Sequence, residues 1–118
     1  MAYRSFEELE VWKAACQLSV EIYAELRDCR DFGLKDQMTR AAVSIASNIA
    51  EGAERNSAPD YTRFLHIAKG SAAELRTQLY IAHRIGVITL ERQTVLTEDA
   101  KRISAMLQRL AVSLKPKT

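Results

Sequence analysis

Residues 40–52, RAAVSIASNIAEG, decide the fold of this chain. Their seven small or branched apolar side chains cover most of a helix circumference, and such a helix belongs in a protein interior. The polar residues of this region recur at three- and four-residue steps and form one stripe along one face. They are Arg40, Ser44, Ser47, Asn48, Glu51 and Arg55. Because small side chains let a neighbouring helix approach closely, we expect this stretch to form the central helix of a bundle.

The length and composition of the chain favour a helical globular domain. Its 118 residues suffice for one domain with a real core, and we treat residues 1–118 as a single domain. The 47% hydrophobic and 27% charged fractions are those of a soluble globular protein. Only four glycines and two prolines occur, which favours long helices over a turn-rich β fold.

Positive charge is concentrated in the second half of the chain. Residues 1–56 carry 7 basic and 10 acidic side chains, a balance of −3, whereas residues 57–118 carry 10 basic and 5 acidic ones, a balance of +5. Such asymmetry is a mild indication of an anionic partner. The alternative is that these charges belong to ordinary solvated helix faces.

Several absences indicate a cytoplasmic protein. Cys16 and Cys29 match no metal-binding or redox spacing, so we expect two free, mostly buried thiols in a reducing cytosol. The N-terminal stretch MAYRSFEELE has no apolar signal region. The longest charge-free apolar run lies within residues 41–50 and is too short and too polar to span a bilayer. We therefore expect no membrane partner.

Helical periodicity and capping residues predict four helices joined by short connections. Their expected ranges are about 6–27, 34–54, 58–85 and 90–114. The residues expected to cap helix ends are Ser5 with Glu8, Ser57, Thr89 and, at a C-terminus, Gly86. Phe32 is expected to anchor the loop before the second helix. The predicted fold is all-α, an antiparallel up-down-up-down four-helix bundle.

The connection between the second and third helices permits a prediction of their register. If the turn centres near residues 56–57, antiparallel packing places Arg40 beside Glu74. We expect these two charges to form a buried or half-buried pair, because either alone would be costly to bury. The same register places Ser44 beside Gly70. Close backbone contact there would offset the cost of about 1 kcal/mol that glycine carries inside a helix.

Three blocks of the sequence resemble a known family. They are Phe6-x-x-Leu9-x-Val11-Trp12, then RAAVSIASNIAEG at residues 40–52, and then Tyr61-x-x-Phe64-Leu65-x-Ile67-Ala68-x-Gly70-Ser71-x-x-Glu74-Leu75. Together they span most of the chain and resemble the four-helix-bundle proteins encoded in 23S rRNA intervening sequences. The second and third blocks are distinctive in combination, whereas the first alone carries little information.

The resemblance implies a small bacterial bundle that assembles into a ring-shaped homopentamer. The accessory variability determinant of diversity-generating retroelements is similar in fold, and in that setting it is a positively charged pentamer that works with a reverse transcriptase and nucleic acid. The family brings no catalytic residues, so only structural roles carry over. The residues that match its polar signature on the second and third helices are Arg40, Ser44, Asn48, Glu51, Ser71 and Glu74.

Cationic and aromatic residues on the third and fourth helices predict a nucleic-acid-binding surface. The candidate binding residues are Arg63, His66, Lys69, Arg76, Tyr80, His83, Arg84, Lys101, Arg102 and Arg109. Cations near an aromatic ring suit phosphate contact with base stacking, and a ring of subunits would multiply the local positive potential. We expect structured RNA or RNA/DNA to bind without strong sequence specificity. The alternative is an ordinary solvated face or a polar subunit interface.

Catalysis is not expected. The polar residues from which a Ser-His-acid site can be drawn are Ser44, Ser47, Asn48, Glu51 and His66. Polar groups in helix packing produce the same pattern. The chain contains no paired Glu-x-x-His segments, phosphate loop, dinucleotide fingerprint or zinc spacing. We therefore predict no enzyme activity, no cofactor and no metal.

A third hypothesis is a structural or adaptor protein. Besides the apolar face of each predicted helix, the chain has several aromatic residues that need burial. They are Trp12, Tyr23, Phe32, Tyr61 and Phe64. If they exceed what one slender bundle can hide, the surplus forms subunit contacts; the alternative is a monomer that buries them all. We thus predict a homo-oligomer, expected to be a pentamer, that binds RNA or RNA/DNA. The competing prediction is a scaffold for a reverse transcriptase or a ribosomal component without direct nucleic-acid binding.

Overall fold

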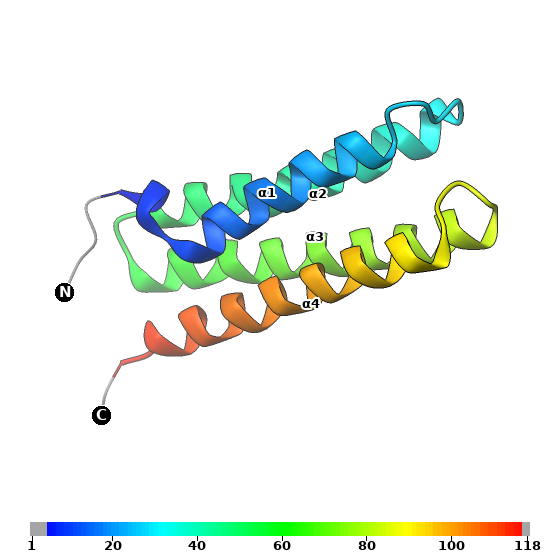
Figure 1. Cartoon of the computed structure of the whole chain (residues 1–118). Helices are drawn as coiled ribbons and strands as arrows, with labels where there is room; N and C mark the ends of the chain where they lie inside the picture. The colour runs from blue at the N-terminus through cyan, green and yellow to red at the C-terminus, as the bar shows by residue number, and fades with distance from the viewer. Residues whose placement is uncertain (1–4, 117–118) are drawn as a thin grey trace.

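The computed structural model describes residues 5–116, which form four α-helices and one short 3₁₀ helix and contain no strand (Figure 1). The elements are η1 (Phe6–Glu8), α1 (Glu10–Glu25), α2 (Phe32–Ala53), α3 (Ala58–Arg84) and α4 (Leu90–Ser113). The molecule is elongated and measures 50 × 21 × 19 Å. The prediction of an all-α, four-helix fold is confirmed.

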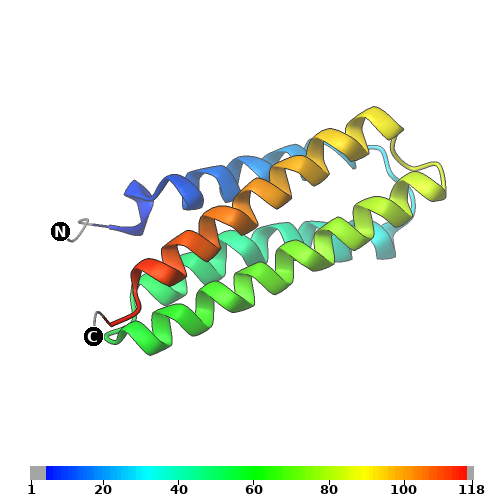
Figure 2. The ribbon, with the colours of Figure 1, turned by 90° about the horizontal axis from the view of Figure 1, so that it is seen from below.

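Helices that are consecutive in the chain run in opposite directions. Ser44 of α2 contacts Ser71 of α3, and further along α2 Gly52 lies against Phe64. Residue numbers therefore rise along α2 as they fall along α3. Helix α1 also packs against α4, which closes a ring of four helices. Figures 1 and 2 both show α1 beginning and α4 ending at the same end of the bundle.

The N-terminal segment departs from the prediction of one helix starting at residue 6. The Ser5 hydroxyl accepts a hydrogen bond from the Glu7 backbone N–H at 2.9 Å and caps η1. Leu9 then adopts an extended backbone, with φ −74° and ψ 127°, so α1 begins only at the next residue. The break leaves the Phe6 ring edge-on to Trp12, with ring centroids 5.4 Å apart.

The connection between α1 and α2 also differs from the prediction. Helix α2 starts at Phe32 because the Asp31 carboxylate accepts a hydrogen bond from the Leu34 N–H at 3.1 Å. The Phe32 side chain is 70% exposed, so the prediction that it anchors the loop is wrong. The half-buried Cys29 and Leu34 pack against the core instead.

The other predicted helix caps are present. The Ser57 hydroxyl accepts a hydrogen bond from the Asp60 N–H at 3.2 Å, and the Thr89 hydroxyl accepts one from the Arg92 N–H at 3.1 Å. Gly86 has φ 85°, a left-handed conformation that glycine adopts without steric cost. The predicted roles of Ser57, Thr89 and Gly86 are therefore confirmed.

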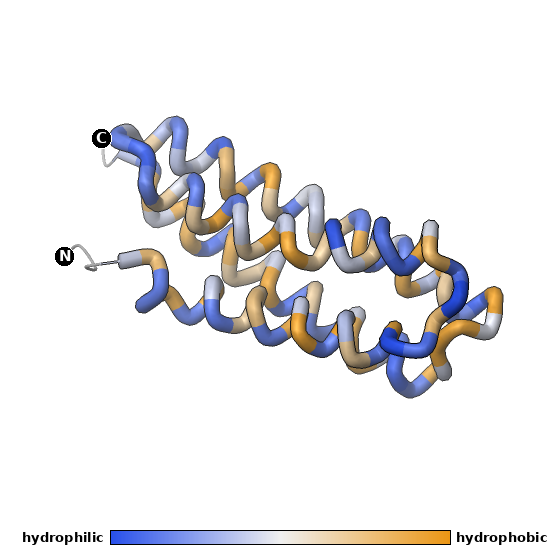
Figure 3. The backbone as a smooth tube through the Cα atoms, turned by 90° about the horizontal axis from the view of Figure 1, so that it is seen from above, coloured by the Kyte–Doolittle hydropathy of each residue, from blue (hydrophilic) through white to orange (hydrophobic). Residues whose placement is uncertain are grey.

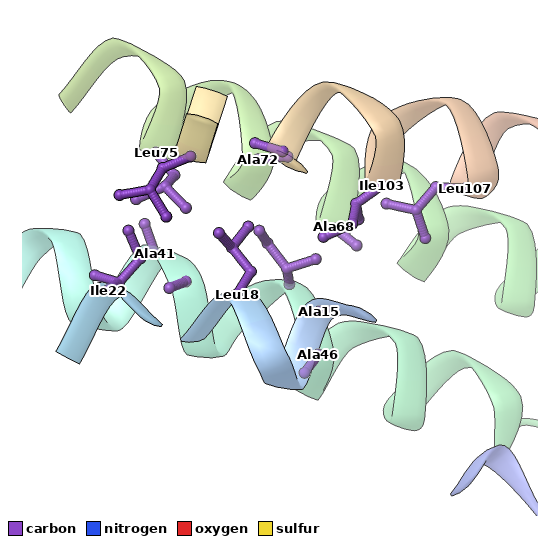
Figure 4. Close-up of a cluster of buried hydrophobic side chains, with 14 of the residues drawn as sticks. Ala15, Leu18, Ile22, Ala41, Ala46, Ala68, Ala72, Leu75, Ile103 and Leu107 are labelled. Carbon is purple, nitrogen blue, oxygen red and sulfur yellow. The ribbon is translucent and has the colours of Figure 1, made fainter. Parts of the chain in front are cut away.

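The core consists mainly of aliphatic side chains from all four helices and also contains Met38 and Tyr61. Hydrophobic residues recur along every helix in Figure 3, and Figure 4 shows how some of them meet. The labelled core residues are Ala15, Leu18, Ile22, Ala41, Ala46, Ala68, Ala72, Leu75, Ile103 and Leu107. Alanines let α2 and α3 share the largest interface of the bundle. This agrees with the expected central position of residues 40–52.

Gly52, rather than Gly70, lies at a close contact between α2 and α3. A Cβ atom on Gly52 would lie 2.8 Å from the Phe64 Cβ and 3.1 Å from a backbone oxygen of α3, whereas one on Gly70 would meet no atom within 4 Å. The predicted pairing of Ser44 with Gly70 is wrong, because the Ser44 Oγ lies 2.8 Å from the Ser71 Oγ. A register difference of one residue is enough to turn Gly70 to the surface.

The predicted buried pair of Arg40 and Glu74 is also wrong. Both side chains are exposed, and the Arg40 Nε lies 2.9 Å from the Asp36 carboxylate one turn earlier in α2. Within residues 5–116, Asp36 is the only carboxylate within 4.0 Å of Arg40. Because neither charge is removed from water, neither needs the other as a buried partner.

Candidate nucleic-acid interface

A groove between α3 and α4 collects cationic, aromatic and amide side chains. Its volume is about 420 Å³, and it is lined by Ala73, Arg76, Thr77 and Tyr80 of α3 and by Gln93, Thr97 and Lys101 of α4. The lining residues of α4 are four apart and therefore share one side of that helix. Three of the predicted binding residues, Arg76, Tyr80 and Lys101, meet in this α3/α4 groove.

The two cations of the α3/α4 groove have little acidic compensation. The half-buried Arg76 forms no ion pair with any residue in the described part of the chain. The Lys101 Nζ lies 3.8 Å from a Glu98 carboxylate oxygen, and both side chains are exposed. Exposed pairs of this kind contribute about 0–1 kcal/mol. The groove therefore presents positive charge to solvent.

Tyr80 is an exposed aromatic residue that a neighbouring cation holds in place. Its side chain is 55% exposed, and its hydroxyl oxygen accepts a hydrogen bond from Arg84 Nη1 at 2.8 Å. The Arg84 guanidinium carbon also lies 5.7 Å from the centroid of the tyrosine ring, within the range of a cation–π contact. These two contacts restrict the orientation of the ring at the edge of the α3/α4 groove.

Uncharged polar groups complete the wall that α4 contributes. The Gln93 side-chain N–H donates a hydrogen bond to the Thr97 hydroxyl oxygen at 3.1 Å. The side-chain oxygen of Gln93 accepts no hydrogen bond from residues 5–116, so it can accept one from a ligand. Further along the same pair of helices, Lys69 donates to the Gln108 side chain and extends the positive charge of this face.

Arg63 lies apart from the α3/α4 groove, at the end of the bundle where α2 joins α3. Its guanidinium carbon lies 4.5 Å from the Phe64 ring centroid, and that of Arg55 lies 4.8 Å from the same centroid. The Arg63 Nε is 3.9 Å from Asp60, and Arg55 Nη2 is 2.8 Å from Glu51. Each cation of this cluster thus has an acidic neighbour, and the aromatic ring beneath them is only half-exposed.

Four other predicted binding residues, His66, His83, Arg102 and Arg109, are not among the side chains that line the α3/α4 groove. Arg102 bonds the Asp99 carboxylate at 2.7 Å and borders a groove between α1 and α4. The Nδ1 of the half-buried His83 lies 3.3 Å from a carbonyl oxygen of the α3–α4 connection. His66 and Arg109 are exposed and form no hydrogen bond within the described residues.

Ser44, Asn48 and Ser71 of the polar signature form a hydrogen-bonded network between α2 and α3, whereas its charged members are exposed. The Ser44 and Ser71 hydroxyls are 2.8 Å apart, and the Asn48 side-chain amide donates to the Ser44 carbonyl at 2.8 Å and to its hydroxyl at 2.9 Å. Glu51 pairs with Arg55. No histidine or carboxylate contacts the two serines within residues 5–116. This network joins two helices, and its geometry offers no activated nucleophile.

A second groove, between α1 and α2, is apolar. Its volume is about 320 Å³, and it is lined by Trp12, Cys16, Ser19, Val43, Ala46, Ser47 and Ala50. Partial burial in these surroundings raises the pKa of the Cys16 thiol. Val20 and Tyr23 continue the apolar surface along α1 and are 61% and 53% exposed. This α1/α2 groove carries no charged side chain in its wall.

Sequence reasoning missed Gln93, Thr97 and the ion pairs between α1 and α4. The four-residue spacing of Gln93, Thr97 and Lys101 is the signal that groups them on one side of α4. Arg92 bonds Glu25 at 2.9 Å and lies 3.4 Å from Glu21, and the bond to Glu25 is the main cause that raises the pKa of Arg92. No spacing rule reveals contacts between helices so far apart in the chain.

Residues 5–116 contain neither a cluster of metal-binding side chains nor a helix suited to a membrane. No three side chains of the metal-binding types cluster closely enough to hold an ion. None of the described helices combines the length and apolar character needed to cross a membrane.

Comparisons with known proteins identify a matching family and a similar solved structure. Residues 7–109 match the family described as 23S rRNA-intervening sequence protein. The crystal structure of a Bacteroides thetaiotaomicron protein of unknown function from the S23 ribosomal protein family is similar, with a TM-score of 0.81 and 27% sequence identity. The similarity covers 86% of this chain and 97% of that protein. Comparison with curated protein sequences gives no significant match.

Proposed function

Because the chain belongs to the 23S rRNA-intervening sequence protein family, we propose that it is a non-enzymatic, self-associating protein whose α3/α4 groove binds nucleic acid. The observation that carries this proposal is the meeting of Arg76, Lys101 and Tyr80 in one groove. Cations with weak acidic compensation attract phosphate groups, and an exposed aromatic ring offers a face to a base. No base-reading motif accompanies them, so binding follows backbone and shape.

Self-association is supported by two separate apolar surfaces. One is the α1/α2 groove, and the other is suggested by two exposed isoleucines of α3, Ile67 and Ile81, which are 41% and 44% exposed. Contact between two different surfaces joins copies head to tail, and such contacts close into rings when the rotation permits. We expect a pentamer, as the resemblance in sequence implies. A ring repeats the α3/α4 groove and strengthens the local positive potential.

The test is a charge reversal in the α3/α4 groove with a matched control. Arg76→Glu should weaken binding of a fluorescein-labelled RNA hairpin or RNA–DNA hybrid by at least about tenfold and reduce the salt dependence of affinity. Arg30→Glu makes the same change in net charge in the exposed connection between α1 and α2 and should have much less effect. Fluorescence anisotropy between about 50 and 200 mM salt measures both. Equal losses in the two variants, or affinity independent of salt, would contradict the proposal.

The α1/α2 groove favours a second candidate function, that of a protein-binding adaptor. Its uncharged wall suits a protein surface better than a polyanion. In this case the partner is a protein such as a reverse transcriptase, and the chain itself has no affinity for nucleic acid. Failure of the wild-type protein to bind any of the labelled nucleic acids at low salt would support the adaptor.

A further inference from the structure

We infer that the α3/α4 groove accepts one unpaired nucleotide unit, with its base stacked on Tyr80 and its phosphates held by Arg76 and Lys101. The protein then prefers single strands to duplexes. This inference rests on the proposed function and specifies the substrate class of the same groove. The inference adds stacking of one base on an aromatic ring. The proposed function by itself requires only that the cations bind phosphate groups.

The size of the α3/α4 groove suits one nucleotide unit better than a duplex. Its volume of about 420 Å³ lies in the range of sites that enclose a small molecule, about 300–1,000 Å³. In a duplex the faces of a base are covered by the bases above and below it. Only an unpaired, unstacked base can offer its face to a side chain at the groove.

The position of Tyr80 suits stacking of such a base. The side chain is 55% exposed and lines the α3/α4 groove, while Arg84 holds its hydroxyl oxygen at 2.8 Å. A ring held in this way loses little conformational freedom when a base binds. Phe64 provides a contrast, because it is half-buried and two guanidinium groups lie within 4.8 Å of its ring centroid, whereas Tyr80 has one such neighbour, at 5.7 Å.

Two cations line the same groove as Tyr80 and are available to the phosphates that flank a stacked base. Arg76 is one helical turn before Tyr80, a spacing that brings Cβ atoms to about 5–6 Å. Lys101 approaches from the opposite wall of the groove. A base stacked on Tyr80 therefore has a cation on either side of the groove available to its backbone.

The uncharged polar residues of α4 can form hydrogen bonds with the edge of any base. The Gln93 side-chain oxygen is a free acceptor, and the Thr97 hydroxyl accepts from Gln93 but can still donate its own proton. One acceptor and one donor satisfy part of the edge of each common base without selecting one of them. The groove should therefore discriminate between paired and unpaired bases more strongly than between base types.

The experiment compares three fluorescein-labelled probes of equal length: a uridine RNA strand, the same strand made abasic, and its duplex with adenosine RNA. The wild-type protein should bind the uridine strand about tenfold more tightly than either of the others, as expected for one stacked base. Tyr80→Ala should abolish this preference and leave the affinities for the abasic strand and the duplex nearly unchanged. Tyr80→Phe should retain most of the preference, because it keeps the aromatic face.

Phe32→Ala is the matched control, because Phe32 is 70% exposed but begins α2 and lines neither the α1/α2 groove nor the α3/α4 groove. It should leave the affinity for all three probes unchanged. Equal binding of the uridine and abasic strands by the wild-type protein would overturn the inference while leaving the proposed function intact. Arg76→Glu tests the proposed function separately from the inference. If this variant bound the abasic strand as tightly as the wild-type protein does, the proposed function itself would be overturned.

Discussion

The α1/α2 and α3/α4 grooves are formed in the same way but have different chemistry. Each lies along the seam of two helices that run in opposite directions, and their volumes are about 320 and 420 Å³. Trp12, Cys16 and Val43 line the first, whereas Arg76 and Lys101 line the second. The core beneath both is mainly aliphatic. The chemistry of each groove is therefore set by the side chains that line its seam.

The difference in chemistry suits the two grooves to different partners. An apolar wall gains free energy from contact with another protein surface, at roughly 25 cal/mol for each Å² of apolar area removed from water. A cationic wall would lose hydration in such a contact and gains instead from a hydrated polyanion. We therefore expect mutations in one groove to leave the activity of the other largely intact, and the following predictions test this independence.

The largest expected effect is the loss of self-association when a charge enters the α1/α2 groove. Val43 is 41% exposed, and Val43→Glu would place an unpaired carboxylate in the proposed subunit contact. We expect self-association to weaken on the order of a hundredfold, because a buried unpaired charge costs several kcal/mol. Native mass spectrometry or sedimentation measures the change.

The matched control for this variant is Val112→Glu on α4, where the valine is 50% exposed. It should leave the assembly unchanged. Short single-stranded RNA should still bind each subunit of the Val43→Glu protein, because the α3/α4 groove is untouched and only the positive potential of neighbouring subunits is lost. An intact oligomer in Val43→Glu, or dissociation in the control alone, would contradict the assignment of the α1/α2 groove to subunit contact.

A smaller effect is expected from the packing of α2 on α3, which sets the two grooves relative to each other. Gly52→Ala brings a Cβ to 2.8 Å from the Phe64 Cβ, and overpacking of this kind costs about 1–3 kcal/mol. Gly70→Ala meets no atom within 4 Å and should stabilise the subunit by about 1 kcal/mol through helix propensity. Urea unfolding at low protein concentration measures both; a loss of stability in Gly70→Ala would show that the register of α2 and α3 is different.

The smallest expected effect concerns the thiol of the α1/α2 groove. Burial raises the pKa of Cys16, so the neutral thiol is favoured in the folded chain. The contribution of this group to stability is present below the thiol pKa of the unfolded chain, about 8.5, and is lost as the pH rises through the folded value. In a Cys29→Ser protein, the pH midpoint of Cys16 alkylation should be higher when the chain is folded than when it is unfolded in urea.

The same reaction also tests the role of the α1/α2 groove. If another copy covers this groove, alkylation of Cys16 should slow as the protein concentration rises. In the Val43→Glu protein the rate should not depend on concentration. A rate that is independent of concentration in both proteins would indicate that the groove stays open in the assembly.

Local features of the fold were predicted where the governing interaction spans only a few residues. Ser57 and Thr89 cap the N–H groups three residues later, and Gly86 adopts the left-handed turn that ends α3. Prediction failed at Leu9 and Phe32, where the chain leaves or enters a helix. The extended backbone of Leu9 interrupts the helical pattern, and the Asp31 cap starts α2 at an exposed phenylalanine.

The cationic and aromatic residues of the α3/α4 groove were among the predicted binding residues, but their arrangement was not predicted. Spacing along α3 identified Arg76 and Tyr80 as neighbours, because the spacing of side chains on one helix is known from its geometry. Lys101 and Arg102 are consecutive, yet Lys101 lines the α3/α4 groove and Arg102 borders α1. One residue turns the helix by about 100°, so the rotation of α4 decides which cation faces which neighbour.

The amino-acid sequence by itself determined the class of the fold, the four helices and most of their ends, because periodicity and capping act within one helix. Only the tertiary structure decided that Gly52 rather than Gly70 is the close contact, that Arg40 pairs within its own helix, and which side chains share a groove. Those outcomes depend on the register and rotation of packed helices. A shift of one residue moves a side chain from the interface to the solvent. The sequence pattern does not fix the register to within one residue.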